Sequence, residues 1–112
     1  MRADVLVLYP EGLLSGNPTG SDFVLVITEL AEREVVPPVV IDFTAVTDIG
    51  IPAVVTLCYA YYEWKAQDAP LVFCGEMKGR ALEVYSGAKL GNMFTLFPTE
   101  AEALAHCQAN QS

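Results

Sequence analysis

The chain has 112 residues, of which 53% are apolar and 18% are charged, and its 6 basic and 14 acidic side chains give a net charge of −8. This length predicts one domain, and the high apolar share excludes intrinsic disorder. The acidic balance argues against nucleic acid and anionic membranes as partners, and no apolar run reaches the roughly 18 residues of a membrane span. No signal peptide pattern or metal-binding cysteine spacing is present. We therefore expect a soluble, cytoplasmic domain without a metal or cofactor.

The first third of the chain predicts two short strands and a helix. Residues 5–9 form an apolar run that ends at a proline, which is typical of a strand, and residues 12–14 predict a second, shorter one. Residues 15–20 are rich in Gly, Pro, Ser and Asn and predict a loop. A helix is expected from residue 21 to about residue 34.

The middle of the chain predicts a buried strand followed by a long helix. Residues 39–43 are apolar and mostly β-branched, which indicates a central strand covered on both faces. Residues 44–50 predict a loop. A helix is expected from Pro52 to about residue 67, because proline is favoured at the first helical position.

The last third predicts two more strands, each followed by a helix. Residues 71–74 indicate a buried strand, 76–86 a helix and 93–97 the last strand. Thr99 and Glu102 have the spacing of a capping box at the start of the final helix. Strands that alternate with helices in this way predict an α/β fold with a largely parallel sheet.

No group of residues predicts an active site. The only histidine, His106, is expected near the end of the last helix, where a surface position is more frequent than a catalytic one. Cys58 and Cys74 lie in apolar segments that favour inert, buried thiols. Asp42 lies near the end of a predicted central strand and Asp48 in the loop after it, at the sheet edge where α/β proteins bind ligands. Paired carboxylates of this kind bind magnesium or act as acid and base, but bracing of the loop is the more frequent role.

Several motifs resemble the STAS family, which is shared by anti-sigma-factor antagonists and sulfate transporters. The strand that ends in Asp42, and residues 44–47 after it, match the family's apolar strand and its Ser/Thr-Gly-Val segment. Residues 71–74 look like the next family strand, and residues 90–104 are similar to its C-terminal pattern of a strand and a helix ending in Glu-x-Ala-Leu. The resemblance implies one α/β domain over residues 1–112. It also implies a mixed, mostly parallel sheet of four to five strands, with about four helices packed mainly on one face.

The resemblance also implies a docking module without catalysis, which in many members is switched by phosphorylation of a serine at the start of the second helix. The family's Asp-Ser-Ser-Gly motif falls on residues 50–53 without gaps, or on residues 48–51 with a two-residue deletion. The ungapped version makes Ile51 the equivalent of the phosphorylated serine, and isoleucine cannot accept phosphate. Thr44 and Thr47 are weaker candidate phosphosites, because threonines in a loop more often bond its backbone.

The predicted second helix carries two apolar stripes. We expect the first stripe to face the sheet, and it consists of Val54, Leu57, Cys58, Tyr61 and Lys65. The second stripe lies about 100° round the helix, and it consists of Val55, Tyr59, Tyr62 and Ala66. The tyrosines and Trp64 are typical anchors of protein interfaces, so this second stripe meets either a neighbouring helix or a partner.

We therefore expect a non-enzymatic regulatory module that binds a protein partner. The expected contact residues lie in the loop and the second helix, and they are Asp48, Ile49, Gly50, Ile51, Pro52, Val55, Tyr59 and Tyr62. The expected partner is an anti-sigma factor kinase or a related bacterial regulator of transcription, and a homodimer stays open. The alternatives are an accessory or scaffold subunit of a transporter or signalling assembly, or a nucleotide or small-molecule sensor that uses residues 42–50.

Overall fold

The structure, a computed structural model, describes residues 5–14 and 21–109. The loop expected at residues 15–20 lies outside this part of the chain. Within it, strands and helices alternate as the sequence predicts, and the predicted α/β fold is confirmed.

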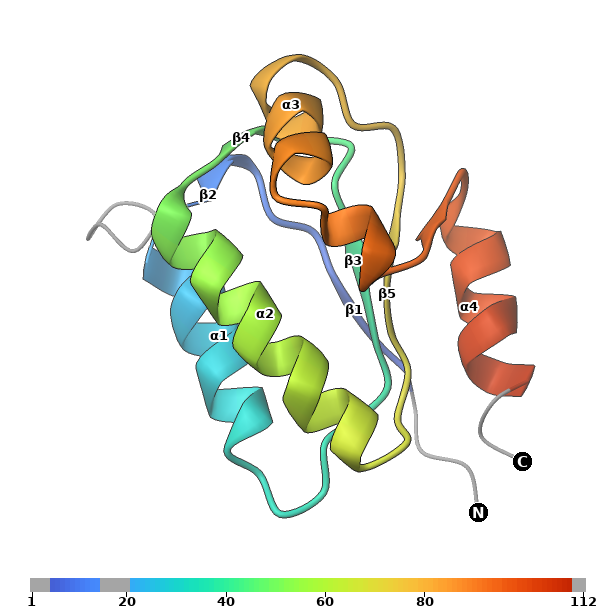
Figure 1. Cartoon of the computed structure of the whole chain (residues 1–112). Coiled ribbons are helices and arrows are strands. Elements are labelled where there is room, and N and C mark those ends of the chain that lie inside the picture. Colours follow the sequence, from blue (N-terminus) through green and yellow to red (C-terminus); the bar gives the residue numbers. More distant parts are fainter. Residues whose placement is uncertain (1–4, 15–20, 110–112) are drawn as a thin grey trace.

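The main sheet has four strands in the order β1–β3–β5–β6 (Figure 1). The strands are β1 (Leu6–Leu8), β3 (Val39–Asp42), β5 (Leu71–Cys74) and β6 (Leu96–Phe97). Every pair of neighbouring strands in this sheet is parallel, and Val40 of β3 lies opposite Val7 and Val72. Both central strands are almost wholly buried, which explains their unbroken apolar sequences.

A second, two-stranded sheet pairs β2 (Gly12–Leu14) with β4 (Val46–Ile49) in parallel. The prediction that residues 44–50 form only a loop is therefore wrong. Val46 and Ile49 are buried at the two ends of β4, and the backbone N–H of Gly50 donates to the Leu14 carbonyl at 2.6 Å. The strand forms because of this pairing with a distant segment, which a local pattern does not reveal.

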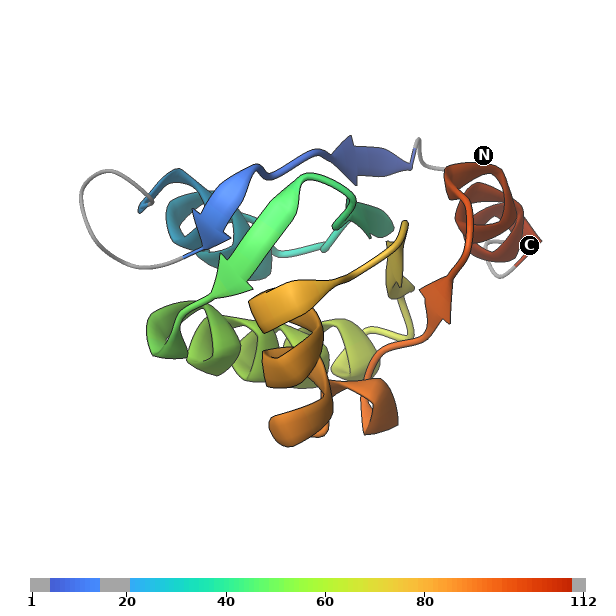
Figure 2. The ribbon, with the colours of Figure 1, turned by 90° about the horizontal axis from the view of Figure 1, so that it is seen from above.

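Helices cover the main sheet on both faces. They are α1 (Ser21–Ala31), α2 (Ile51–Ala66), α3 (Gly79–Gly87) and α4 (Glu100–Ala109). Helices α1 and α2 lie side by side on one face, α3 packs against β4, and α4 covers β3 and β5 on the opposite face (Figure 2). The backbone N–H of Glu102 donates to Thr99 Oγ1 at 3.2 Å, which is one of the two bonds of the expected capping box.

The last strand is shorter than predicted. Residues 93–95 were expected to begin it, but the 3₁₀ turn η1 (Leu90–Asn92) precedes β6. The backbone N–H groups of Met93 and Phe94 both donate to the Leu90 carbonyl, so these residues continue the turn instead of pairing with β5.

The larger of two cores lies between the sheet and helices α1, α2 and α3. The Phe73 ring stacks on Phe94 at 4.4 Å between centroids and contacts Phe43 at 4.5 Å. A smaller core under α4 contains Val40, Val72, Cys74, Ala103 and Cys107. The sheet is therefore enclosed, and α2 stands as one wall of the larger core.

Candidate docking surface

Helix α2 has apolar residues on every side, but only one side faces the core. Its buried residues follow one stripe, and they are Ala53, Leu57, Ala60 and Trp64. Of the first predicted stripe only Leu57 is fully buried, so the expected orientation of the helix is wrong by part of a turn. A helix that is apolar all round gives no periodicity from which its orientation can be predicted. The small side chains of Ala53 and Ala60 let α2 lie close to the core, and Trp64 fills the space at its end.

Trp64 is a structural residue and not an exposed anchor. Its side chain is 1% exposed, and its indole Nε1–H donates to the Pro37 carbonyl at 2.7 Å. The Gln67 side chain accepts the Val36 backbone N–H at 2.9 Å. These two bonds fasten the segment after α1 to the C-terminal end of α2, and they remove Trp64 from the candidate interface.

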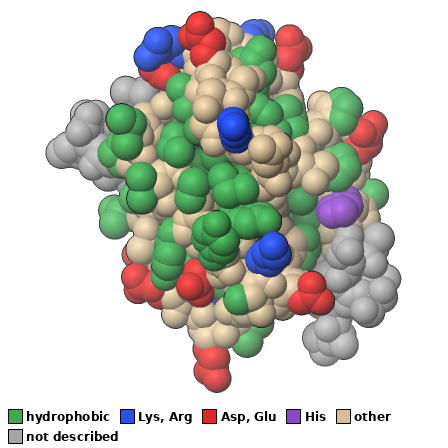
Figure 3. Space-filling view, viewed as in Figure 1, with side chains coloured by type: hydrophobic (Ala, Val, Ile, Leu, Met, Phe, Trp, Pro, Cys, Tyr) green, Lys and Arg blue, Asp and Glu red, His purple; other side chains and the backbone are tan. Residues whose placement is uncertain are grey.

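The opposite side of α2 is exposed and apolar. Large side chains point to solvent there, with exposed fractions of 79% for Ile51, 61% for Val55, 44% for Tyr59 and 66% for Tyr62. We call these four residues, together with the half-exposed Cys58, the outer face of α2. Figure 3 shows hydrophobic side chains gathered over this helix on one side of the molecule.

The outer face is connected to the core through aromatic contacts. The half-buried Tyr61 ring meets Tyr62 edge to face at 5.2 Å between centroids, and it meets the buried Phe94 at 5.7 Å. Lys65 Nζ lies 5.4 Å from the centre of the same ring. Tyr62 thus packs against Tyr61, which its contact with the core holds in place. Binding a partner there would cost less side-chain conformational entropy.

The outer face begins at a helix N-terminus that lacks a side-chain cap. Gly50 is the N-cap residue, and its carbonyl accepts the Val54 backbone N–H at 3.1 Å. Pro52 is the second residue of α2, so the helix begins one residue before the predicted start, and no acidic residue lies in its first turn. Ile51 projects into solvent at this end of the helix. The positive end of the helix dipole lies here, and no acidic side chain in the first turn compensates it.

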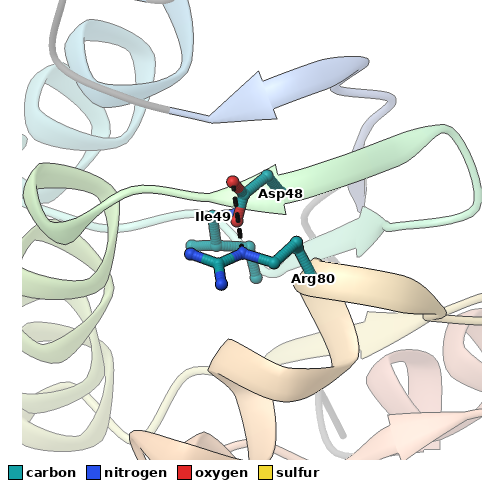
Figure 4. Close-up of polar contacts among 3 residues, drawn as sticks. All are labelled: Asp48, Ile49 and Arg80. Carbon is teal, nitrogen blue, oxygen red and sulfur yellow. Dashed lines mark hydrogen bonds and ion pairs between the residues drawn. The ribbon is translucent and has the colours of Figure 1, made fainter.

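Asp48 stabilises the turn that leads into α2. One carboxylate oxygen accepts the Ile49 backbone N–H at 2.8 Å, and the other lies 3.8 Å from Arg80 Nε on α3 (Figure 4). An exposed ion pair of this kind contributes at most about 1 kcal/mol. Ile49 itself is 3% exposed, so among the expected contact residues it supports the turn from inside and offers no side chain to a partner.

Asp42, the second candidate carboxylate, braces a different turn. Its Oδ1 accepts the Thr44 backbone N–H at 2.8 Å. Gly75 packs against this turn with φ +91°, and a Cβ there would lie 2.6 Å from Asp42 Oδ1. Asp42 and Asp48 thus bond separate groups of the protein. Thr44 and Thr47 are both exposed.

The three cysteines differ in their surroundings. Cys74 and Cys107 are buried, and burial raises the pKa of each thiol to about 11. For Cys74 the negative charges of Asp42 and Glu100 add to the effect. Both thiols are therefore protonated and inert near neutral pH, as expected for Cys74. Cys58 was expected to be buried as well, but it is half-exposed on α2.

Other features of the described residues are weaker candidates for a functional site. An open cleft of about 320 Å³ lies beside the C-terminal end of α2, between Lys65 and His106. The His106 ring packs on Phe97 with 5.1 Å between centroids. No three His, Cys, Asp or Glu side chains in the described ranges are grouped as metal ligands would be. No described helix is long and apolar enough to cross a bilayer.

Comparisons with known proteins agree on the fold. The family model of the STAS domain matches residues 4–103. The STAS domain of a SulP transporter from Vibrio cholerae has a similar solved structure, with a TM-score of 0.68 and 14% sequence identity over 94% of this chain and 81% of that one. No curated protein sequence matches the chain.

Proposed function

The chain belongs to the STAS domain family, and we propose that it acts as a regulatory module of the anti-sigma-factor antagonist type. STAS domains mediate protein–protein interactions, so the module works by binding and has no catalytic step. Its contact surface consists of the turn at Asp48, Gly50, Ile51 and Pro52 and of Val55, Tyr59 and Tyr62 on the outer face of α2, with Ile49 as an internal support. The partner is an anti-sigma factor kinase or a related bacterial regulator.

The outer face of α2 is the observation that supports this proposal most strongly. A helix that is apolar all round is normally buried on all sides, yet four large apolar side chains of α2 remain exposed. Two of them are tyrosines, a residue type enriched among the energetically dominant contacts of interfaces. A protein partner that covers this face completes the burial that the domain leaves open.

We also propose that phosphorylation at the usual position does not switch this module. The first residue of α2 is the exposed Ile51, which has no hydroxyl to accept a phosphate. In family members with a serine there, a phosphate adds two negative charges at the contact surface. Without that serine, binding is controlled by the partner or by the amount of protein.

Affinity capture with paired variants tests the docking surface. We expect the tagged protein to capture a specific partner from its native cell, and the double variant Tyr59→Ala, Tyr62→Ala to lose at least 90% of it. Truncation of a central aromatic contact costs about 2 kcal/mol or more, which corresponds to a loss of roughly thirtyfold in affinity.

The control variant removes exposed apolar side chains elsewhere. Leu6 on β1 and Val35 after α1 are 37% and 75% exposed, and Leu6→Ala with Val35→Ala is expected to capture the partner normally. Circular dichroism and thermal melting show that both variants are folded. Equal capture by the two double variants would remove α2 from the proposed surface.

A role as an accessory STAS subunit of a transporter or signalling assembly is the second candidate. It is supported by the solved SulP transporter STAS domain, which has the same fold. The two candidates predict different captured proteins, namely a soluble kinase or an integral membrane transporter. Mass spectrometry of the captured material distinguishes them.

We propose the cytoplasm as the working location. The thiols of Cys74 and Cys107 lie in one buried cluster and are unbonded, and Cys58 is also free. Free thiols are typical of reducing compartments.

A further inference from the structure

The outer face of α2 has the spacing of a coiled-coil seam. Ile51, Val55, Cys58 and Tyr62 follow one another at intervals of four, three and four residues, which is the pattern of helices that pack against each other. The buried stripe on the opposite side has the same spacing, so α2 carries two seams and the domain covers one of them.

We propose that a second copy of this chain packs antiparallel on the outer face of α2. A two-fold axis crossing the helix between Thr56 and Leu57 places Ile51 of one copy against Tyr62 of the other, and Val55 against Cys58. The larger side chains then lie at the ends of the contact and the smaller ones near the axis, where the helices approach most closely. The interface is isologous, as in most homodimers.

Charge complementarity favours the antiparallel direction. The N-terminal end of α2 has no acidic residue in its first turn and lies near Arg80, which pairs with Asp48. The C-terminal end carries Glu63 and Asp68 as well as Lys65. The hydrogen bonds of Trp64 and Gln67 also hold the segment after α1 at this end, and its exposed charged residues are Glu32, Arg33 and Glu34. An antiparallel partner brings this more acidic end to the uncapped N-terminus, and the two helix dipoles also oppose each other.

The contact is expected to be weak. One pair of four-turn helices buries roughly 1,000 Å² in total, near the lower limit of specific interfaces, and the net charge of −8 on each copy opposes association. We therefore expect a dissociation constant on the order of 10 µM. Self-association goes beyond the proposed function and does not depend on it. If the proposed function is also correct, the dimer hides the docking surface, and a partner must displace the second copy.

Cys58 makes the arrangement directly testable in the natural sequence. The other two cysteines are fully buried, whereas Cys58 is half-exposed and falls within about one helical turn of the proposed axis. A short bismaleimide, which joins two thiols through thioether bonds, is therefore expected to trap a covalent dimer of the purified protein. Sedimentation velocity between about 5 and about 500 µM is expected to show a monomer that converts to a dimer.

Three variants separate this dimer from other forms of association. Val55→Glu puts a like charge on each copy close to the two-fold axis and is expected to give a monomer and at least a tenfold loss of crosslinking. Leu82→Glu adds the same charge at a 43% exposed residue of α3 and is expected to dimerise like the original protein. Cys58→Ser is expected to sediment as a dimer without being crosslinked. Thermal melting confirms that each variant is folded.

Two results would overturn the proposal. One is a monomer at every concentration, and the other is a dimer that survives Val55→Glu, because a different surface then holds it. Purified protein is used alone, so neither result bears on partner binding. Conversely, a failure to capture any partner through α2 leaves the sedimentation result unchanged, so the two proposals fail separately.

Discussion

At the scale of single residues, Ile51 stands where we propose that other family members carry the phosphorylated serine. It begins α2, it is 79% exposed, and the helix dipole would favour a phosphate there. The position is thus open to a kinase, and only the side chain lacks an acceptor. The exposed residues Thr44 and Thr47 lie in the preceding turn and strand.

We expect an anti-sigma-factor kinase to add no phosphate to this protein. Incubation with the kinase and ATP, followed by intact-mass measurement, checks this expectation. The kinase's own serine-containing STAS substrate serves as the positive control under the same conditions. Stoichiometric labelling of Thr44 or Thr47 would show that the switch has moved to the segment before α2 and is not absent.

At the scale of elements, α2 divides its apolar residues between two opposite sides. The buried side joins the larger core, and the exposed side is occupied by no described element. Residues of the same type therefore have different energetic roles on this helix, depending on their position around its axis.

We expect Leu57→Ala to lower the free energy of unfolding by about 2–5 kcal/mol, because Leu57 is fully buried and its truncation leaves a cavity. Val55→Ala, two residues earlier, is expected to change it by less than about 0.5 kcal/mol in the monomer, since Val55 is 61% exposed. Urea denaturation at low protein concentration measures both values. Similar losses for the two variants would mean that α2 is oriented differently.

The sequence predicts the elements better than their orientation. The central strands were predictable because parallel strands that are covered on both faces leave unbroken apolar runs. Strand β4 was not, because its pairing with β2 joins segments about 35 residues apart. The orientation of α2 depends on the fit of Ala53, Ala60 and Trp64 into the core, and the bond from Trp64 to Pro37 has no local sequence signal.

The candidate site was predicted from the sequence on the segment before the second helix and on that helix, and the structure shows which of its side chains are exposed. Val55, Tyr59 and Tyr62 were placed on a second stripe, and all three are exposed. Ile49 was included with the contact residues and Trp64 was named as a typical interface anchor, yet both side chains are buried. Burial at these two positions follows from neighbours that come from distant parts of the chain. The pairing of Asp48 with Arg80 is likewise a contact between elements more than 30 residues apart.

At the scale of the whole molecule, the apolar residues, which make up 53% of the chain, lie in two kinds of place. The enclosed sheet and its two cores use most of it, and the outer face of α2 holds a part that the fold does not bury. A net charge of −8 opposes the aggregation of such a surface. The described residues thus leave one apolar side of α2 uncovered.

The central claim is that the outer face of α2 contacts another protein chain, and site-specific photo-crosslinking in the native cell tests it most directly. A benzophenone amino acid replaces either Tyr62 on the outer face or Val35 after α1, which are 66% and 75% exposed. We expect position 62 to give a discrete covalent adduct on irradiation, with a partner protein or a second copy, and position 35 to give none. Adducts of equal yield from both positions, or none from position 62, would contradict the account.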